Sequence, residues 1–381
     1  MKVVVAVDSF KGSMTSMEAA RAVRDGILAA DPKTYIVIKP LADGGEGTTD
    51  ALIEGMHGEK VRITVTGPYG EKIHSYYGYL PEKKTAVIEM AAAAGITLSD
   101  KRDPMQATTY GVGEMISDAI DRGCCDIIMG IGGSATTDGG IGMMKALGIQ
   151  FLDENGNDVG EGAQALFRVR KIQTEGVHPF LSKVRFQIAC DVTNPLCGPQ
   201  GAVYVFGPQK GVTEEIKAML DEAMNRYAAV VESTLGIRCR DIPGAGAAGG
   251  LGFACLAFLN AVLTPGIDLV LNAVDLESEL LDADIVVTGE GRLDEQTAMG
   301  KAPVGVAKRA KKYGAKVIAF AGSVTEGAGA CNKEGIDAFF PIVRGVTTLD
   351  EAMSKETAMA NMRAASEQVF HLFRETSRTI R

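Results

Sequence analysis

The apolar positions of the chain form two kinds of stretch, which alternate near both ends of the sequence. Short apolar runs rich in branched side chains cover residues 2–7, 34–39, 284–288 and 316–321. Runs of this kind predict strands that are buried on both faces, as in a parallel sheet. Helical stretches follow them, and Thr15 and Glu18 have the spacing of a capping box at the start of a helix. The two ends of the chain therefore predict one parallel α/β domain.

The middle of the chain has a different pattern. Residues 61–65 alternate between apolar and polar side chains, and the segments 76–79 and 86–88 follow turns. These features predict hairpin-like strands and hence a mixed sheet. Helices are expected at residues 108–122 and 213–235, and a further helix is expected to run through Leu263. We therefore predict an α/β fold with two domains: residues 1–65 plus 284–381 form a parallel-sheet domain, and residues 66–283 form an inserted mixed domain.

The loop from Gly130 to Gly140 is the most distinctive segment of the chain. It follows an apolar run and combines glycines with hydroxyl and carboxylate side chains, in the sequence GIGGSATTDGG. Glycines let the backbone approach a ligand, and the first amides of the next helix are unpaired donors for an anion. The alternative is a turn with an ordinary helix cap. We favour an anion site, because a cap needs one such residue and this loop has Ser134, Thr136, Thr137 and Asp138.

Four other predicted strand ends carry similar chemistry. They are the segments beginning at Asp8, Asp43, Asp191 and Glu290. Ligands of open α/β sheets bind at the carboxyl ends of strands. Five such loops in one chain suggest one shared cleft between the two domains. Lys11 could pair with an anion there, or it could be a solvated loop lysine.

A second glycine-rich segment, Gly244 to Gly252, contains the spacing G-x-G-x-x-G at Gly244, Gly246 and Gly249. This spacing is a dinucleotide fingerprint only where a strand precedes it. Residues 238–243 do not predict a strand. The segment is therefore weak evidence for a nicotinamide nucleotide.

Composition and charge narrow the function. The chain has 381 residues and a formal net charge of −9, which argues against binding to nucleic acid. Its seven cysteines and four histidines show no zinc-site spacing, so we expect reduced thiols in a cytoplasmic protein. The first apolar run is too short for a signal peptide, and no run is long enough to span a membrane. Carboxylates, glycine loops and a few basic side chains, without a Walker A or Ser-His-Asp signature, suit phosphoryl transfer.

Six motifs in order resemble those of the bacterial glycerate kinase family. They are DSFKGSM from Asp8, PLADGGEGT from Pro40, GIGGSATTDGG from Gly130, DVTNPLCGPQGA from Asp191, GAGAAGGLG from Gly244 and VTGEGRLDEQT from Val287. The resemblance covers almost the whole chain. It implies ATP and Mg²⁺ as cosubstrates, D-glycerate as acceptor, 2-phosphoglycerate as product, and a role in glycerate, glucarate and glyoxylate use. It also implies that the domain made from both termini is flavodoxin-like.

Roles can then be expected for individual residues. The catalytic candidates are Asp191 as base or hydroxyl-orienting group, Asp43 second to it, and Lys11 and Arg292 for anionic groups. The expected ATP contacts are Gly132, Gly133, Ser134, Thr136, Thr137, Gly246 and Gly249. The expected glycerate contacts are Asp8, Lys11, Glu46, Asn194 and Arg292. The expected Mg²⁺ ligands are Asp138 and Glu290.

Two other functions remain open from the residues alone. One is an NAD-dependent oxidoreductase of a small hydroxy acid, which rests on the second glycine-rich segment. The other is a non-catalytic regulator that closes on a ligand. The sequence does not decide which loop holds ATP and which holds glycerate, which hydroxyl reacts, or whether the protein is a monomer or a homodimer.

Overall fold

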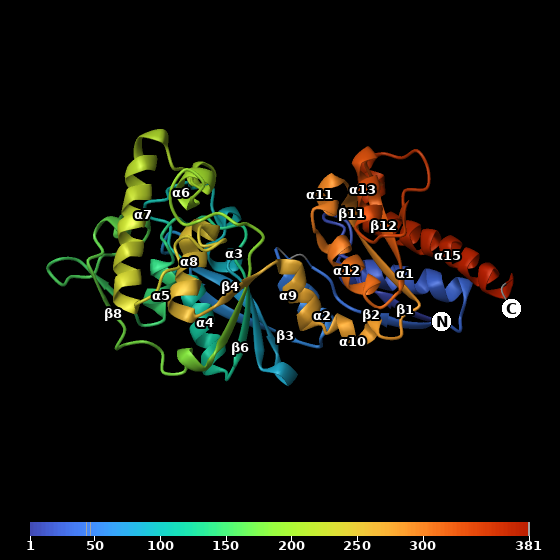
Figure 1. Ribbon diagram of the computed structural model, residues 1–381, viewed down its shortest axis with the longest axis horizontal. Helices are drawn as coiled ribbons and strands as arrows, with labels where there is room; N and C mark the ends of the chain where they lie inside the picture. The colour runs from blue at the N-terminus through green and yellow to red at the C-terminus, as the bar shows by residue number, and fades with distance from the viewer. Residues whose placement is uncertain (43, 46, 380–381) are drawn as a thin grey trace. The chain divides into compact units, whose positions relative to one another are not determined.

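The computed structural model describes residues 1–42, 44–45 and 47–379, with the side chains of 376–379 excepted, and it divides the chain into two compact units. Unit 1 comprises Met1–Asp43, Asp50–His57 and Val270–Arg381, and unit 2 comprises Gly44–Thr49 and Gly58–Leu269. Both ends of the chain thus belong to unit 1 (Figure 1). The exact domain limits expected from the sequence stay a prediction.

Unit 1 is built on a parallel sheet of five strands. They are β1 (Lys2–Val5), β2 (Tyr35–Ile38), β11 (Ile285–Leu293), β12 (Lys316–Val324) and β13 (Ala338–Pro341). All are paired in parallel, in the order β2-β1-β11-β12-β13. Numbered within the unit, this order is 2-1-3-4-5, which is that of flavodoxin-like sheets. The side chains of residues 3–5 of β1 and 285–288 of β11 are buried, which explains why these segments are continuous apolar runs.

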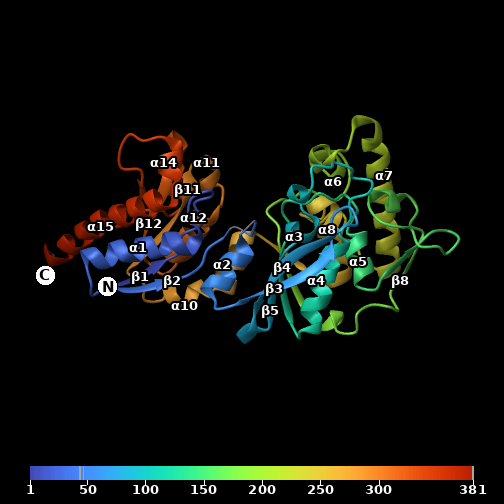
Figure 2. The ribbon, with the colours of Figure 1, turned by 180° about the vertical axis from the view of Figure 1, so that it is seen from behind.

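The two long helices of unit 1 are α1 (Ser16–Ala30) and α15 (Lys355–Thr379), which lie side by side (Figures 1 and 2). The predicted capping box starts α1, because Thr15 Oγ1 accepts from Glu18 N at 3.2 Å and Glu18 Oε2 accepts from Thr15 N at 3.0 Å. A side chain at Gly26 would collide with the backbone of α15, so glycine permits the close approach. The shorter helices with residues in this unit are α2 (Thr48–Gly55), α9 (Gly266–Ala273), α10 (Leu276–Leu280), α11 (Glu295–Ala298), α12 (Ala302–Lys311), α13 (Ala330–Lys333) and α14 (Leu349–Met353).

Unit 2 is built on a mixed sheet of six strands in the order β10-β9-β6-β5-β4-β3. They are β3 (Glu59–Thr66), β4 (Lys72–Leu80), β5 (Thr85–Glu89), β6 (Asp126–Gly130), β9 (Arg185–Ala189) and β10 (Val262–Thr264). The pairs β3–β4 and β4–β5 are antiparallel, and the other pairs are parallel. A separate antiparallel pair consists of β7 (Gln150–Leu152) and β8 (Lys171–Gln173). The helices are α3 (Ala91–Ala94), α4 (Tyr110–Asp121), α5 (Ile141–Ala146), α6 (Ala202–Phe206), α7 (Glu214–Leu235) and α8 (Ala247–Leu259).

The predicted fold class is confirmed, with one parallel and one mixed sheet, and two local predictions were wrong. The helix expected to reach Leu263 ends at Leu259, where Asn260 adopts a left-handed backbone with φ +48°, and β10 follows. Strand β11 continues through Glu290 and Arg292, which were expected in a loop, because it pairs with β12 along its whole length. A further capping box, formed by Thr348 and Glu351, starts the short α14.

Candidate active site

A pocket of about 530 Å³ lies in unit 1 at the carboxyl ends of four neighbouring strands. Asp8 follows β1, Glu290 and Arg292 lie near the end of β11, and Ser323 lies near the end of β12. The strand order reverses between β1 and β11, so this edge contains the topological switch point of the sheet. Open α/β sheets bind their ligands at such a point.

Four candidates from distant parts of the sequence line this one pocket: Asp8, Lys11, Glu290 and Arg292. Their proximity follows from the pairing of β1 with β11, which places both strand ends at one edge of the sheet. The structure thus brings these four candidates together, whereas one cleft shared by all five loops stays a prediction. Their individual roles stay predictions.

Two further charged residues of the pocket were missed. Asp294 Oδ2 lies 3.7 Å from Arg292 Nε, and Asp294 Oδ1 lies 3.8 Å from Lys301 Nζ. The Arg292 and Lys301 side chains are 65% and 41% exposed, so an anion entering the pocket could reach both. In the sequence, Gly300-Lys301 is followed by Ala302, whereas a Walker A motif has Ser or Thr at that position. This segment therefore only excluded a Walker A motif and did not mark Lys301 as a site residue.

The carboxylates of this pocket are held in a defined arrangement by α11. Thr297 Oγ1 donates to Glu290 Oε1 at 2.6 Å, and Thr297 N donates to Asp294 Oδ1 at 3.1 Å. Asp8 is almost fully buried and accepts from Ser9 N at 2.7 Å. Mg²⁺ is commonly held by one or two carboxylates together with substrate phosphates. Glu290 fits that use, although among the described residues no group of three acidic, Cys or His side chains forms a ready-made metal site.

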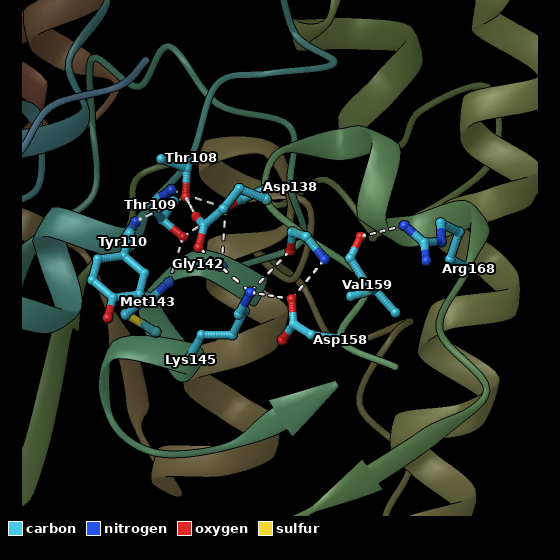
Figure 3. A network of polar contacts seen from close by, with 12 residues as sticks. Thr108, Thr109, Tyr110, Asp138, Gly142, Met143, Lys145, Asp158, Val159 and Arg168 are labelled. Carbon is cyan, nitrogen blue, oxygen red and sulfur yellow. Dashed lines mark hydrogen bonds and ion pairs between the residues drawn. The ribbon is translucent and has the colours of Figure 1, made fainter. Parts of the chain in front are cut away.

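Asp138, the other expected Mg²⁺ ligand, lies in unit 2 and is fully buried. Its Oδ2 accepts from Thr109 N at 2.9 Å, from Thr109 Oγ1 at 2.8 Å and from Gly142 N at 3.2 Å, and its Oδ1 accepts from Gly140 N at 3.1 Å (Figure 3). Burial raises the pKa of Asp138, and these hydrogen bonds oppose that shift. The contacts tie α4 to the start of α5, so the carboxylate has a structural use. Its metal role stays a prediction that this geometry does not support.

The Gly130–Gly140 loop uses much of its polar capacity inside unit 2. Ser134 is 7% exposed, Thr136 and Thr137 are fully buried, and Gly132 and Gly133 are exposed. Several amides already have acceptors: Ala135 N donates to Ala94 O, Gly139 N to Gly249 O, Gly140 N and Gly142 N to Asp138, and Met143 N to Thr109 Oγ1. The predicted ATP contacts of this loop stay untested, and those amides are not open donors.

Lys210 lies beneath the same loop and was not predicted. It ends the 3₁₀ segment Pro208–Lys210, and its side chain is buried. Nζ donates to Ser134 Oγ at 2.6 Å and to Thr136 O at 2.7 Å. Burial lowers the pKa of Lys210 to about 7, and the charge of Asp138 opposes this shift. The sequence carries no signal for it, because a lysine is rarely fully buried and Gln209-Lys210-Gly211 looks like an ordinary solvated turn.

The second glycine-rich segment packs directly against the first. A Cβ at Gly249 would overlap with the Thr136 carbonyl oxygen, and a Cβ at Gly246 would overlap with the Pro195 carbonyl oxygen. Gly249 also has φ +68°, which favours glycine. No strand precedes Gly244 among residues 236–243, all of which are described. Close packing thus explains these glycines, and the dinucleotide-binding alternative loses its support.

Asp191 and Asn194 follow β9 in unit 2. Asp191 is exposed, and its Oδ1 accepts from Gly266 N at 2.9 Å at the start of α9. Asn194 Nδ2 donates to Gln200 O at 2.7 Å. Both side chains are therefore oriented by backbone groups. Asp43 and Glu46, the remaining candidates, lie outside the described residues.

Comparisons with known proteins were made against families, curated sequences and solved structures. A sequence model described as "Glycerate kinase family" matches residues 3–374. The glycerate kinase of Bacillus subtilis (strain 168) is 48% identical over 354 residues, and the glycerate 2-kinase of Escherichia coli (strain K12) is 47% identical over 354 residues. Each alignment covers 92% of this chain and 93% of the relative. A crystal structure from Salmonella typhimurium LT2, which carries the provisional name glycerate kinase 2, superposes with a TM-score of 0.92 at 43% identity and 99% coverage of both chains.

No helix in the described part of the chain is both long and apolar enough to cross a membrane.

Proposed function

The chain belongs to the glycerate kinase family, and from this premise we propose that it transfers the γ-phosphoryl group of ATP to the 2-hydroxyl of D-glycerate. The observation that carries the proposal is the 47% identity with the Escherichia coli glycerate 2-kinase over 92% of this chain. The pocket at the switch point of unit 1 supports it, because its basic side chains suit anionic reactants. The NAD-dependent alternative is not pursued, since the strand it requires is absent ahead of Gly244.

Phosphoryl transfer to a hydroxyl group requires neutralisation of the phosphate charge and a base that accepts the hydroxyl proton. Catalysis of phosphoryl transfer is mainly positioning and electrostatic stabilisation. Lys11 and Arg292 would hold anionic groups of the reactants, and Glu290 would hold Mg²⁺. When bound, Mg²⁺ would neutralise charge on the phosphate oxygens. The 2-hydroxyl oxygen forms the new bond to phosphorus, ADP leaves, and the hydroxyl proton passes to Asp191 as the base.

Replacing Asp191 by asparagine is expected to lower kcat at least about 100-fold while both reactants still bind, because the amide cannot take the proton. Steady-state kinetics with ADP detection measures the change. The exposed Asp100 in the same unit offers a matched control, and Asp100→Asn should keep kcat within about twofold of wild type. A near-normal kcat for Asp191→Asn would remove Asp191 from the catalytic role.

The function itself is tested by following ADP release with D-glycerate, with L-glycerate and without acceptor. We expect release that requires Mg²⁺ and is fastest with D-glycerate. If no hydroxy acid stimulates ADP release, the proposed function is wrong.

We further propose that the enzyme acts in the cytoplasm as a monomer or homodimer, without nucleic acid. All seven cysteines, each in the described part of the chain, are free thiols, as is usual in reducing compartments. The formal net charge of −9 argues against binding to a phosphate backbone.

A further inference from the structure

We propose that the pocket at the carboxyl ends of β1, β11, β12 and β13 is the nucleotide site, with the phosphates at Lys11, Arg292 and Lys301 and the base against α14. This inference rests on the proposed function and goes beyond it by assigning one reactant to one site. It also differs from the expectation from sequence, which placed ATP at the Gly130–Gly140 loop.

The position of the pocket is the first argument. A 2-1-3-4-5 sheet binds its ligand where the strand order reverses, and in flavodoxin-like folds that place, between the first and third strands, takes a phosphate-bearing ligand. Here the corresponding strands are β1 and β11. Asp8 and Lys11 follow β1, and Glu290 and Arg292 lie on the last part of β11. A phosphorylated ligand is therefore expected at this edge on topological grounds.

The size of the pocket is the second argument. Sites of about 300–1,000 Å³ enclose ligands of the size of a drug or a nucleotide. The volume here is about 530 Å³. A three-carbon acid would fill only a small part of that space and would leave the rest to water. A nucleoside di- or triphosphate uses most of it.

The charge of the lining is the third argument. Three cationic side chains, Lys11, Arg292 and Lys301, belong to the pocket. The Asp294 carboxylate oxygens lie 3.7 Å from Arg292 Nε and 3.8 Å from Lys301 Nζ. Both distances are longer than a hydrogen bond, so phosphate oxygens can compete with Asp294 for these two cations. Arginine forks and lysine ammonium groups are the usual partners of phosphates. One carboxylate group of glycerate would need fewer of them.

The apolar part of the lining is the fourth argument. Leu349 and Met353 of α14 line the pocket but are 73% and 36% exposed, respectively. The capping box of α14 fixes them, since Thr348 Oγ1 accepts from Glu351 N at 3.3 Å. A Cβ at Gly12 would lie 2.8 Å from Met353 Cε, so glycine there lets Met353 lie against the loop after β1. A planar base would cover these apolar side chains, whereas glycerate has no apolar surface to offer them.

The fifth argument is the burial and internal hydrogen bonding of the Gly130–Gly140 loop, the other candidate for the nucleotide site. Thr136, Thr137 and Asp138 are fully buried, and the amides of Gly139 and Gly140 donate within unit 2. A phosphate cradle needs open amides. The part of the loop from Ala135 to Gly140 would have to exchange these internal bonds before its amides could bind triphosphate.

Binding of a fluorescent ADP analogue, mant-ADP, to the full chain tests the assignment. Lys301→Gln removes a phosphate contact, and Leu349→Asp places a negative charge beside the base. Each is expected to raise the Kd of mant-ADP about tenfold, as for loss of one charge-assisted contact. Matched controls are Lys308→Gln, an exposed lysine of α12, and Leu281→Asp, an exposed leucine that does not line the pocket, and both should bind like wild type.

Two measurements, the Kd of mant-ADP and the kinetics of D-glycerate phosphorylation, separate failure of the inference from failure of the proposed function. If the Kd of mant-ADP is unchanged in Lys301→Gln and Leu349→Asp while the KM of D-glycerate rises about tenfold, the pocket is the acceptor site and the inference is wrong, although the kinase function stands. If wild type binds mant-ADP with the predicted sensitivity but phosphorylates no hydroxy acid, the proposed function fails and the site assignment stands.

Hydrogen exchange on the unmodified protein gives a second test that does not depend on variants. Saturating ADP should slow exchange in residues 8–13, 290–294 and 342–353 and leave residues 130–140 unchanged. Protection confined to residues 130–140 would overturn the assignment.

Discussion

Replacing Asp138 by alanine is expected to lower the free energy of unfolding by about 4 kcal/mol, measured by urea denaturation. The carboxylate is fully buried and accepts four hydrogen bonds, from Thr109 N, Thr109 Oγ1, Gly140 N and Gly142 N. Each buried donor left without an acceptor costs about 1–3 kcal/mol, and some relaxation will recover part of the sum. Activity should fall because the loop and the start of α5 lose their anchor.

Two further variants make this prediction specific. Asp138→Asn should lose less stability than Asp138→Ala, because the asparagine carbonyl can still accept from Thr109. It should still be less stable than wild type, because the asparagine NH₂ group would face the Gly140 N–H, and two donors cannot bond each other. Asp158→Ala is the control: its side chain is 53% exposed and pairs with Lys145, so it should cost at most about 1 kcal/mol. If Asp138→Ala unfolds like wild type but no longer responds to Mg²⁺, Asp138 is a metal ligand and the structural account is wrong.

Replacing Lys210 by methionine is expected to change how stability depends on pH. Burial lowers the pKa of Lys210 to about 7 in the folded protein. Between about pH 7 and pH 10 the unfolded chain therefore binds a proton at this lysine that the folded chain does not. The stability of wild type relative to Lys210→Met should rise with pH across this window, by about 1.4 kcal/mol per pH unit.

Urea unfolding at pH 7.5 and pH 9.5 measures the effect as a difference between the two proteins, so that other titrating groups cancel. We expect the free energy of unfolding of wild type minus that of Lys210→Met to become more positive by about 2–3 kcal/mol from pH 7.5 to pH 9.5. Lys171→Met, at an exposed position of unit 2, is the matched control. A difference that does not vary with pH would mean that the ammonium of Lys210 stays charged in the fold.

Much of the fold could be predicted from local patterns, because those patterns report burial directly. The apolar runs at residues 2–7 and 284–288 became β1 and part of β11, which are buried on both faces. Thr15 and Glu18 form the expected capping box. The same reasoning brought Asp8, Lys11, Glu290 and Arg292 to one edge of the sheet, where they line one pocket, since strand ends of a parallel sheet meet at one edge.

Other features depend on contacts between distant segments, which the sequence does not display. Glycines that open a loop to a ligand look the same as glycines that admit a neighbouring backbone. Gly249, close to Thr136, is of the second kind. Lys210 is buried only because it lies under a loop whose contacting residues, Ser134 and Thr136, precede it by 76 and 74 residues in the chain. Lys301 reaches the pocket because α11 turns the chain back toward the end of β11.

The most direct test of the proposed function is ³¹P NMR of a reaction containing the protein, ATP, Mg²⁺ and D-glycerate. We predict that the signal of 2-phosphoglycerate grows in step with that of ADP. Formation of 3-phosphoglycerate in its place, or ADP with inorganic phosphate and no phosphorylated acid, would contradict the proposal that this protein is a glycerate 2-kinase.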